Sequence, residues 1–297
     1  MTMDETTRDD IRKVPASAGA QWLIDGFALL KASPGGLGMM GVLYGVCAAV
    51  VVGMSVVAPE IGFVLQTALL LVVPLLTGGL VWAAREVAQG RPVGPASYGE
   101  PFRQGKVGAL LITLLPQVVL GLGMAILLLL LVGSDNLQII ASVMEKMQAA
   151  QPGTPPDPAL MASLPSGRML LWLLCVVVLA LVMFLMTFVA VPDIMLGGSG
   201  GLQALRRSWR ASVRNLPAVL VFIGVALVTL IGVSLLAGIV GMIVRMIAGP
   251  AGQAMVSQLL TMAIIVPIIW GAIGRAWESM LGRESAPPAL PAGQLLA

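Results

Sequence analysis

The sequence predicts an all-helical integral membrane protein with six transmembrane helices. Of its 297 residues, 58% are hydrophobic and only 10% are charged, whereas a soluble domain is about 25% charged. Lys, Arg, Asp and Glu are absent from six long stretches, which are 32–59, 61–84, 107–134, 169–192, 215–244 and 246–274. Crossing a bilayer as a helix takes about 20 apolar residues. Each stretch therefore holds one span, and the composition excludes a soluble protein.

The chain divides into a transmembrane domain over 19–282 and two short tails. The expected spans are about 36–58, 61–84, 108–132, 169–191, 217–243 and 254–274, with one sizeable outer segment over 133–168. The tails, 1–18 and 283–297, are polar or proline-rich, so we expect them to be disordered. The acidic start of the chain lacks the basic and apolar regions of a signal peptide, which predicts that the first span inserts uncleaved.

Orientation follows from the distribution of positive charge. Of the 17 lysines and arginines, all but Lys146, Arg168 and Arg245 lie in the tails or in connections on one side of the predicted membrane. Cytoplasmic loops carry the excess of Lys and Arg. Both termini are therefore expected in the cytoplasm of a bacterial cell, with the protein in the inner membrane.

The outer segment begins with a predicted amphipathic helix over 136–150. Its apolar side chains recur at helical spacing at Leu137, Ile140, Val143 or Met144, and Met147. Such a helix is typical of one that lies on a membrane surface. The proline-rich stretch 151–158 ends it.

An internal repeat is suggested by similar segments. VPLLTGGL at 73–80 resembles VPIIWGAI at 266–273, and 191–198 holds a shorter version. Aromatic and basic residues, followed by Gly or Pro, precede the first, third and fifth spans. We expect three pseudo-repeated hairpins, each preceded by a cytoplasmic interfacial amphipathic helix, around an axis normal to the membrane.

The clearest of these interfacial helices is 202–215. Leu202, Leu205, Trp209 and Val213 form its apolar stripe, and arginines recur every fourth residue beside it. The arginines are expected to face lipid phosphates, either as a general anchor that controls topology or as specific recognition of an anionic headgroup. The residues predicted to contact headgroups are Arg206, Arg207, Arg210, Arg214, Trp209, Trp22, Lys31, Arg103 and Lys106.

Small residues and prolines mark expected packing features. Gly41, Gly45, Ala49 and Gly53 recur at four-residue spacing, which favours close helix packing within the chain or, alternatively, a homodimer seam. Kinks are expected at Pro74, Pro116, Pro192 and Pro267. Gln117 is polar and well inside its span, so it is a candidate cavity residue, although an interhelical hydrogen bond is the simpler use.

Catalytic and metal-binding patterns are missing. The chain has no histidine, and Cys47 and Cys175 lie in separate apolar runs, typical of small core residues. No ionisable residue lies near the centre of a span, which argues against an ion-coupled carrier. We expect no enzyme activity, cofactor, metal or nucleic-acid partner. The charged residues at the cytoplasmic boundary, Arg85, Glu86, Asp193, Arg275 and Glu278, fit either structural ion pairs or a shallow polar mouth.

Three segments together resemble a known family. They are IRKVPASAGAQWLIDGFALLKASP, VPLLTGGLVWAAREVAQGRPVGPASYGEPFRQGKVGALL and GLQALRRSWRASVRNLPAVLVF, in that order. The pattern resembles uncharacterised proteobacterial six-helix inner-membrane proteins, which are distantly similar to the membrane domain beside some glycerophosphodiester phosphodiesterases. The likeness covers 11–283 apart from the outer segment. The resemblance implies no activity, because the family has no established function and no assigned catalytic residues. Phosphodiesterase activity is not implied either, because the soluble phosphodiesterase domain and its metal-binding acids are absent.

Three functional classes remain, and one of them, a membrane-embedded enzyme, would require polar side chains that converge near Arg85, Glu86, Asp193 and Glu278. The other two are the main hypotheses. The first is a non-enzymatic envelope or scaffold protein whose interfacial helices contact anionic membrane lipids. The second is an uncoupled transporter, channel-like or lipid-handling protein with a cavity between its hairpins. A cavity lined by Thr113, Gln117 and Thr229 would favour the second, and a tightly packed interior the first.

Overall fold

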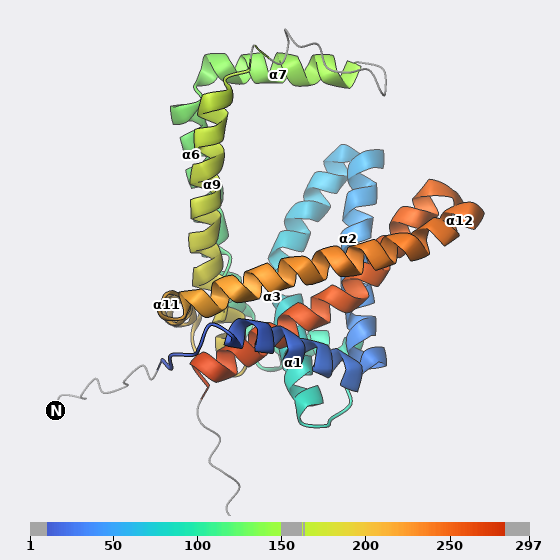
Figure 1. Cartoon of the computed structure of the whole chain (residues 1–297), viewed down its shortest axis with the longest axis vertical. Coiled ribbons are helices and arrows are strands. Elements are labelled where there is room, and N and C mark those ends of the chain that lie inside the picture. The colour runs from blue at the N-terminus through green and yellow to red at the C-terminus, as the bar shows by residue number, and fades with distance from the viewer. Residues whose placement is uncertain (1–10, 150–161, 163, 283–297) are drawn as a thin grey trace, which may run out of the picture. The chain divides into compact units, whose positions relative to one another are not determined.

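The computed structural model describes residues 11–149, 162 and 164–282, which form helices, turns and loops (Figure 1). The parts of the predicted tails at 1–10 and 283–297, and the proline-rich stretch 151–158, lie outside the described residues. The chain splits into two compact units. One contains residues up to Thr113 and from Thr187 onward, and the other runs from Leu114 to Met186.

The helices follow one another in chain order. They are α1 (Ala18–Ala32), α2 (Pro34–Val57), α3 (Pro59–Ala88), the 3-10 helix η1 (Pro95–Gly99), α4 (Glu100–Arg103), α5 (Val107–Ile112), α6 (Leu115–Leu131), α7 (Ser134–Ala149), α9 (Ser166–Thr187), α10 (Ala190–Met195), α11 (Gly201–Arg214) and α12 (Leu216–Met280).

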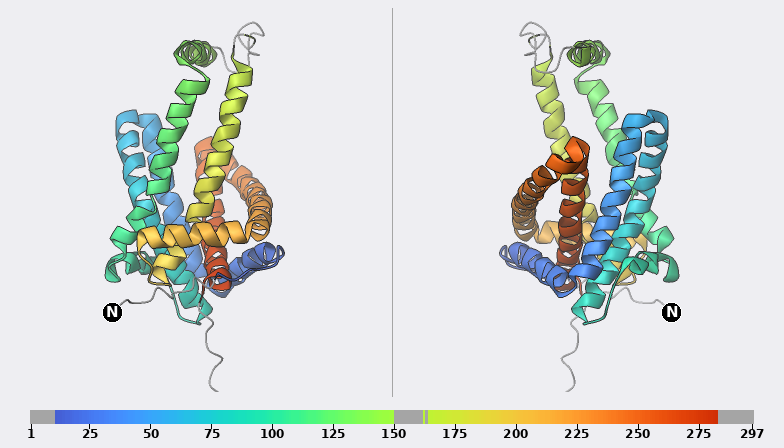
Figure 2. Two further views of the ribbon diagram at one scale, coloured as in Figure 1. Left: turned by 90° about the vertical axis from the view of Figure 1, so that its left-hand side faces the viewer. Right: turned by 90° about the vertical axis from the view of Figure 1, so that its right-hand side faces the viewer.

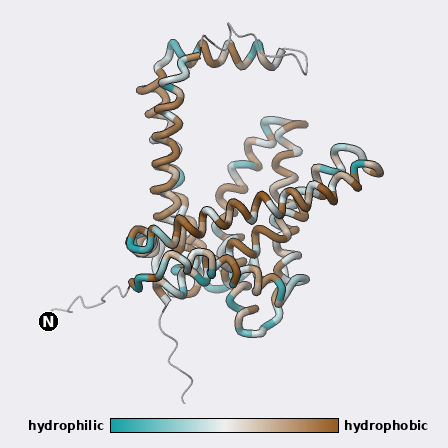
Figure 3. The backbone as a smooth tube through the Cα atoms, in the orientation of Figure 1, coloured by the Kyte–Doolittle hydropathy of each residue, from teal (hydrophilic) through white to brown (hydrophobic). Residues whose placement is uncertain are grey.

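Within the described residues, five helical stretches are long and apolar enough to cross a membrane, where the sequence predicts six. They are Pro34–Val57, Pro59–Ala88, Val107–Leu131, Ser166–Met195 and Leu216–Met280. Figure 3 shows the apolar residues running along α2, α3, α6, α9 and α12. The difference in number arises because both of the last two predicted spans lie within α12.

A break divides α12 at Gly249. A straight helix of its 65 residues would be about 98 Å long, roughly three times the thickness of a bilayer core. Gly249 has a φ of 72°, which favours glycine, and Pro250 follows it. The first segment (216–248) and the second segment (250–280) then fold back on each other, with the Ser257 hydroxyl donating to the Ala237 carbonyl at 3.1 Å (Figures 1 and 2).

Two glycines let α1 approach both segments of α12. A Cβ atom at Gly19 would lie 2.1 Å from the Ala218 carbonyl oxygen, and one at Gly26 would lie 2.3 Å from that of Ile268. Only glycine permits this backbone-to-backbone distance. The helix α1 is therefore fixed across the beginning and the end of α12, which positions the site described below.

Among the described residues, two apolar clusters help to hold this unit together. One is built from α3, α5, α10 and α11 around Leu110, Ile194 and Leu205. The other joins α2, α3 and the second segment of α12 around Leu37, Met40 and Leu80. The polar loop between α3 and α5 is attached to the second cluster, because the Tyr98 hydroxyl donates to the Met40 carbonyl at 2.7 Å. Burial of the ring raises the pKa of Tyr98, with smaller contributions from Tyr44 and Cys47.

The second unit is a pair of long helices, α6 and α9, with α7 between them in the chain. In it α6 and α9 run side by side, and the Trp172 indole donates to the Met124 carbonyl at 3.2 Å. The predicted surface helix of the outer segment is present as α7, whose Val143 is buried and whose Met144 and Met147 are exposed.

Candidate functional site

The segment before α1 is bound to the end of α12. The Arg12 amide donates to the Met280 carbonyl at 2.9 Å. Asn215, at the start of α12, accepts a hydrogen bond from the Val14 amide at 2.8 Å and donates one to the Arg12 carbonyl at 3.0 Å. The prediction of a disordered tail over 1–18 is therefore wrong for its described part, because Asn215 and the α12 terminus supply backbone partners far away in the sequence.

The Arg12 side chain closes the end of α12. Its Nη2 donates to the carbonyls of Glu278 and, at 2.6 Å, of Gly282. The last carbonyls of a helix have no partner within the helix and carry partial negative charge. Arg12 therefore places a cation against the Glu278 carbonyl in the last turn and the Gly282 carbonyl just beyond the helix.

A cavity of about 560 Å³ opens between this segment, α1 and the end of α12. Its lining residues are Arg12, Pro15, Ser17, Ala18, Gln21, Trp22, Asp25, Arg275, Glu278 and Ser279. We call it the Arg12–Arg275 pocket. Its volume is within the range of about 300–1,000 Å³ that is usual for small-molecule sites.

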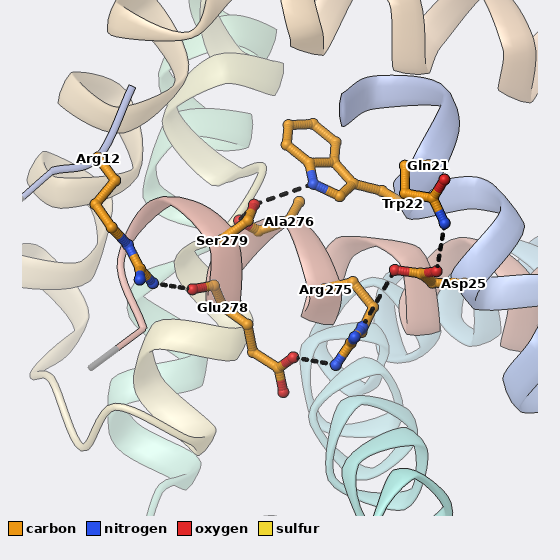
Figure 4. Close-up of polar contacts among 8 residues, drawn as sticks. All are labelled: Arg12, Gln21, Trp22, Asp25, Arg275, Ala276, Glu278 and Ser279. Carbon is orange, nitrogen blue, oxygen red and sulfur yellow. Dashed lines mark hydrogen bonds and ion pairs between the residues drawn. The ribbon is translucent and has the colours of Figure 1, made fainter. Parts of the chain in front are cut away.

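Charges of alternating sign line this pocket (Figure 4). The Arg275 Nη1 atom lies 2.5 Å from Oε2 of Glu278, and its Nε atom lies 3.4 Å from Oδ2 of Asp25. Gln21 donates to the other Asp25 oxygen at 2.9 Å. The side chains of Arg275, Glu278 and Asp25 are 42%, 36% and 29% exposed. They are thus ordered by one another and still accessible from the pocket.

Trp22 forms the inner wall of the pocket. It is 3% exposed, its indole N–H donates to the Ser279 hydroxyl at 3.0 Å, and its ring packs against Phe188 and Phe222. The prediction that Trp22 contacts lipid headgroups is wrong, because the glycines of α1 bring this face of the helix against α12.

A buried ion pair fixes α11 against α10 and α12. The carboxylate of Asp193 is fully buried and accepts hydrogen bonds from Arg207 Nη1 at 3.0 and 3.2 Å and from the Trp277 indole at 3.0 Å. The same Arg207 nitrogen donates to the Ser199 hydroxyl at 2.9 Å. Arg207 is therefore directed inward. The structure does not support the headgroup contact predicted for it, because its guanidinium neutralises Asp193.

The opposite face of α11 is exposed. Gly201, Ala204, Leu205, Ser208, Ala211 and Ser212 are buried. The exposed residues are Leu202, Gln203, Arg206, Trp209, Arg210, Val213 and Arg214. The predicted apolar stripe is thus correct in Leu202, Trp209 and Val213 but not in Leu205, which is 4% exposed. Three arginines and three apolar side chains share one accessible face.

The other predicted headgroup contacts lie on different elements. Lys31 is exposed at the end of α1, and Lys106 is half-buried before α5. The Arg103 side chain is 69% exposed and lies 2.9 Å from Glu100. Their contact with lipid stays a prediction.

The small residues of α2 pack within the chain at one end only. A Cβ atom at Gly41 would lie 2.5 Å from the Met262 carbonyl oxygen, and one at Gly45 would lie 2.9 Å from Met262 Cβ. Gly53 has no such neighbour among the described residues, and Ala49 is half-buried. Intramolecular packing therefore accounts for the first two glycines and does not extend to Gly53.

The four predicted kink prolines have different positions. Pro74 and Pro267 lie inside α3 and α12, whereas Pro116 is in the first turn of α6 and Pro192 in the first half of α10. Pro116 therefore follows a helix break instead of causing a kink inside a helix, consistent with proline's tolerance in a first turn. Gln117 is half-buried in α6 and does not line the Arg12–Arg275 pocket.

The boundary charges are partly brought together. Arg85, Arg275 and Glu278 line a second, much smaller cavity of about 10 Å³. Glu86 pairs instead with Arg91, and this pairing raises the pKa of Arg91. Asp193 pairs with Arg207.

Sequence reasoning named Arg275 and Glu278 at the boundary but missed Arg12 and Ser279 as site residues, since nothing local in the sequence shows that residues so far apart share a pocket.

In class, then, this is a helical chain with several membrane-length apolar helices, an exposed basic helix face and a polar pocket. Comparison with protein-family models, with curated proteins and with solved structures found no match to the chain.

Proposed function

We propose that the chain is a non-enzymatic, multi-pass envelope or scaffold protein of the bacterial inner membrane that binds anionic lipid at the cytoplasmic surface through α11. One observation carries this proposal. Arg206, Arg210 and Arg214 are exposed on the same face of α11 as Leu202, Trp209 and Val213. A helix that presents apolar and basic side chains together suits the boundary between acyl chains and phosphates.

The buried face of α11 supports this role. Asp193 holds Arg207 from inside the fold, and Ala204 and Ala211 are fully buried. The helix therefore cannot rotate to bury its apolar side chains elsewhere. A fixed orientation reduces the conformational entropy that lipid binding would otherwise cost.

Replacing Arg206, Arg210 and Arg214 together with glutamate is expected to weaken retention of phosphatidylglycerol relative to phosphatidylcholine by roughly a hundredfold. Each cation near an anionic surface contributes about 1 kcal/mol, so three contribute about 3 kcal/mol. The measurement is native mass spectrometry of the full-length protein released from mixed micelles at low salt.

A charge-matched control separates this surface from net charge. Lys13, Lys146 and Arg245 are exposed and lie outside α11, so their replacement with glutamate changes the net charge equally. That control should keep its preference for phosphatidylglycerol. Equal retention in the α11 variant and the wild type would refute the proposal.

We propose six spans, with α12 supplying two and both termini in the cytoplasm. The break at Gly249 supports this reading. Helical segments also stand before three of the spans, as α1 before α2, η1 and α4 before α5, and α11 before α12. This order suits three helical hairpins that each begin with a short helical segment before the first span.

A fluorescent protein fused after Ala297 tests the even number of spans. Fluorescent proteins that fold only in the cytoplasm should fluoresce at this end, and a periplasmic alkaline phosphatase fused there should be inactive. The reverse pair of results would place this end outside the cytoplasm and contradict the proposal, as five spans with α12 crossing once would do. Fusions truncated after Gly249 provide the internal control, since they should give the opposite readout from the full-length fusions.

A further inference from the structure

The Arg12–Arg275 pocket has a chemistry distinct from that of α11. We propose that it binds a small zwitterion with a phosphate and an ammonium group, as in the phosphoethanolamine headgroup. This goes beyond the lipid contact assigned to α11 and involves none of its residues.

The balance of charge defines the ligand class. Two guanidinium groups, of Arg12 and Arg275, and two carboxylates, of Asp25 and Glu278, line the pocket. A ligand with only negative charge meets two carboxylates, and one with only positive charge meets two guanidinium groups. A dipolar ligand can place each of its ends against the opposite charge, which is the electrostatic complementarity that selects partners.

Hydrogen-bonding capacity remains on both sides of the pocket. Within the described part of the chain, Arg12 donates through Nη2, although a guanidinium carries five N–H donors. Among the described residues, Arg275 bonds through Nε and Nη1, so its Nη2 can donate to a ligand. Glu278 accepts from Arg275 on Oε2, so its Oε1 can accept from an ammonium. A hydrogen bond from a guanidinium to a phosphate oxygen is charge-assisted and therefore stronger than one between neutral groups.

The walls of the pocket are ordered by contacts outside it. Asn215 holds the backbone of Arg12 and Val14, and the Trp22 indole holds Ser279. A site that is ordered before the ligand arrives loses little conformational entropy on binding.

The outer face of α1 favours a lipid as the source of this headgroup. Ile24 is 58% exposed and Phe27 is 42% exposed, although both lie on the helix that forms the pocket wall. Exposed apolar side chains beside a polar pocket are typical of a helix at a membrane surface. A free phosphoethanolamine compound offers the same chemistry, and the experiment separates the two sources.

The test is calorimetric titration of the full-length protein, in a non-ionic detergent, with O-phosphoethanolamine. Inorganic phosphate, ethylamine and β-alanine serve as partial probes, and we expect each to bind at least about tenfold more weakly, since each lacks one of the charged groups or the phosphate. Native mass spectrometry with phosphatidylethanolamine then identifies the source. Retention of the lipid assigns the site to a membrane headgroup, and binding of the soluble compound alone assigns it to a free phospho-amine.

Matched variants locate the ligand. Glu278→Gln keeps the side-chain shape and removes the negative charge, so it should weaken the binding of O-phosphoethanolamine at least about tenfold. Arg12→Gln should do the same, whereas the exposed neighbour Lys13→Gln should bind like the wild type. If Arg12→Gln fails to fold, Glu278→Gln decides. Three results would overturn the proposal: no binding of either phospho-amine, equal binding of inorganic phosphate or β-alanine, or full affinity in Glu278→Gln. None of these results bears on phosphatidylglycerol binding by α11.

Discussion

Replacing Arg207 with methionine is expected to lower the free energy of unfolding by about 3–5 kcal/mol. Asp193 is fully buried, and Arg207 is the cation that pairs with it. Methionine retains much of the arginine side chain's volume but leaves a buried carboxylate without its counter-charge. The penalty therefore comes from the charge that remains, and not from lost packing. Denaturant titration in detergent micelles, followed by circular dichroism, measures it.

A double replacement tests that explanation. Removing both charges, with Asp193→Leu and Arg207→Met, eliminates the uncompensated carboxylate, and apolar substitutes for buried ion pairs are often neutral. The double variant should therefore be more stable than Arg207→Met alone. A double variant that is less stable than the single variant would show that the network matters through its hydrogen bonds to Trp277 and Ser199.

Replacing Trp22 with alanine is expected to cost about 3–5 kcal/mol of unfolding free energy, the usual range for a large buried aromatic side chain. The ring is 3% exposed and lies against Phe188 and Phe222 at centroid distances of 6.1 and 6.3 Å. Its loss leaves a cavity where α1 meets α12 and removes the hydrogen bond to Ser279.

Trp209 provides the matched control. It is 37% exposed on α11, so Trp209→Ala should change the unfolding free energy by much less than Trp22→Ala. We expect it to weaken lipid retention instead. Equal destabilisation by the two substitutions would contradict the assignment of one tryptophan to the core and the other to the surface.

The apolar helices of this chain follow from its sequence because hydrophobic length needs no long-range information. Uninterrupted apolar stretches correctly predict α2, α3, α6 and α9 and the apolar content of α12. The separation of the last two predicted spans corresponds to the break at Gly249. Whether each stretch crosses a membrane is a further step, which the six-span proposal takes.

The side-chain roles were harder to predict, because both faces of an interfacial helix carry polar and apolar residues. Arg206 and Arg207 are neighbours with the same chemistry, yet one is exposed and the other binds Asp193. Only the path of α10 beside α11 distinguishes them. Similarly, Trp22 and Trp209 occupy comparable positions in their segments, and Gly19 and Gly26 decide that Trp22 is the buried one.

The polar pocket was beyond sequence reasoning for a similar reason. Arg275 and Glu278 are three residues apart and predict a local ion pair, which is present. Arg12 lies at the same pocket because its backbone carbonyl accepts a hydrogen bond from Asn215, about two hundred residues further along the chain. No periodicity or spacing in the sequence encodes such a contact.

The depth of a spin label on the exposed face of α11 shows whether this face lies among lipid headgroups. Val213 is 44% exposed, and Val213→Cys in a background with Cys47→Ala and Cys175→Ala carries a single label. In vesicles containing phosphatidylglycerol, relaxation by oxygen and by a water-soluble nickel complex should place the label at the headgroup boundary. A label at Arg91, whose side chain is 52% exposed in the loop after α3, should respond as a site in water. If the Val213 label also responds as a site in water, α11 does not lie on the membrane and the account is wrong.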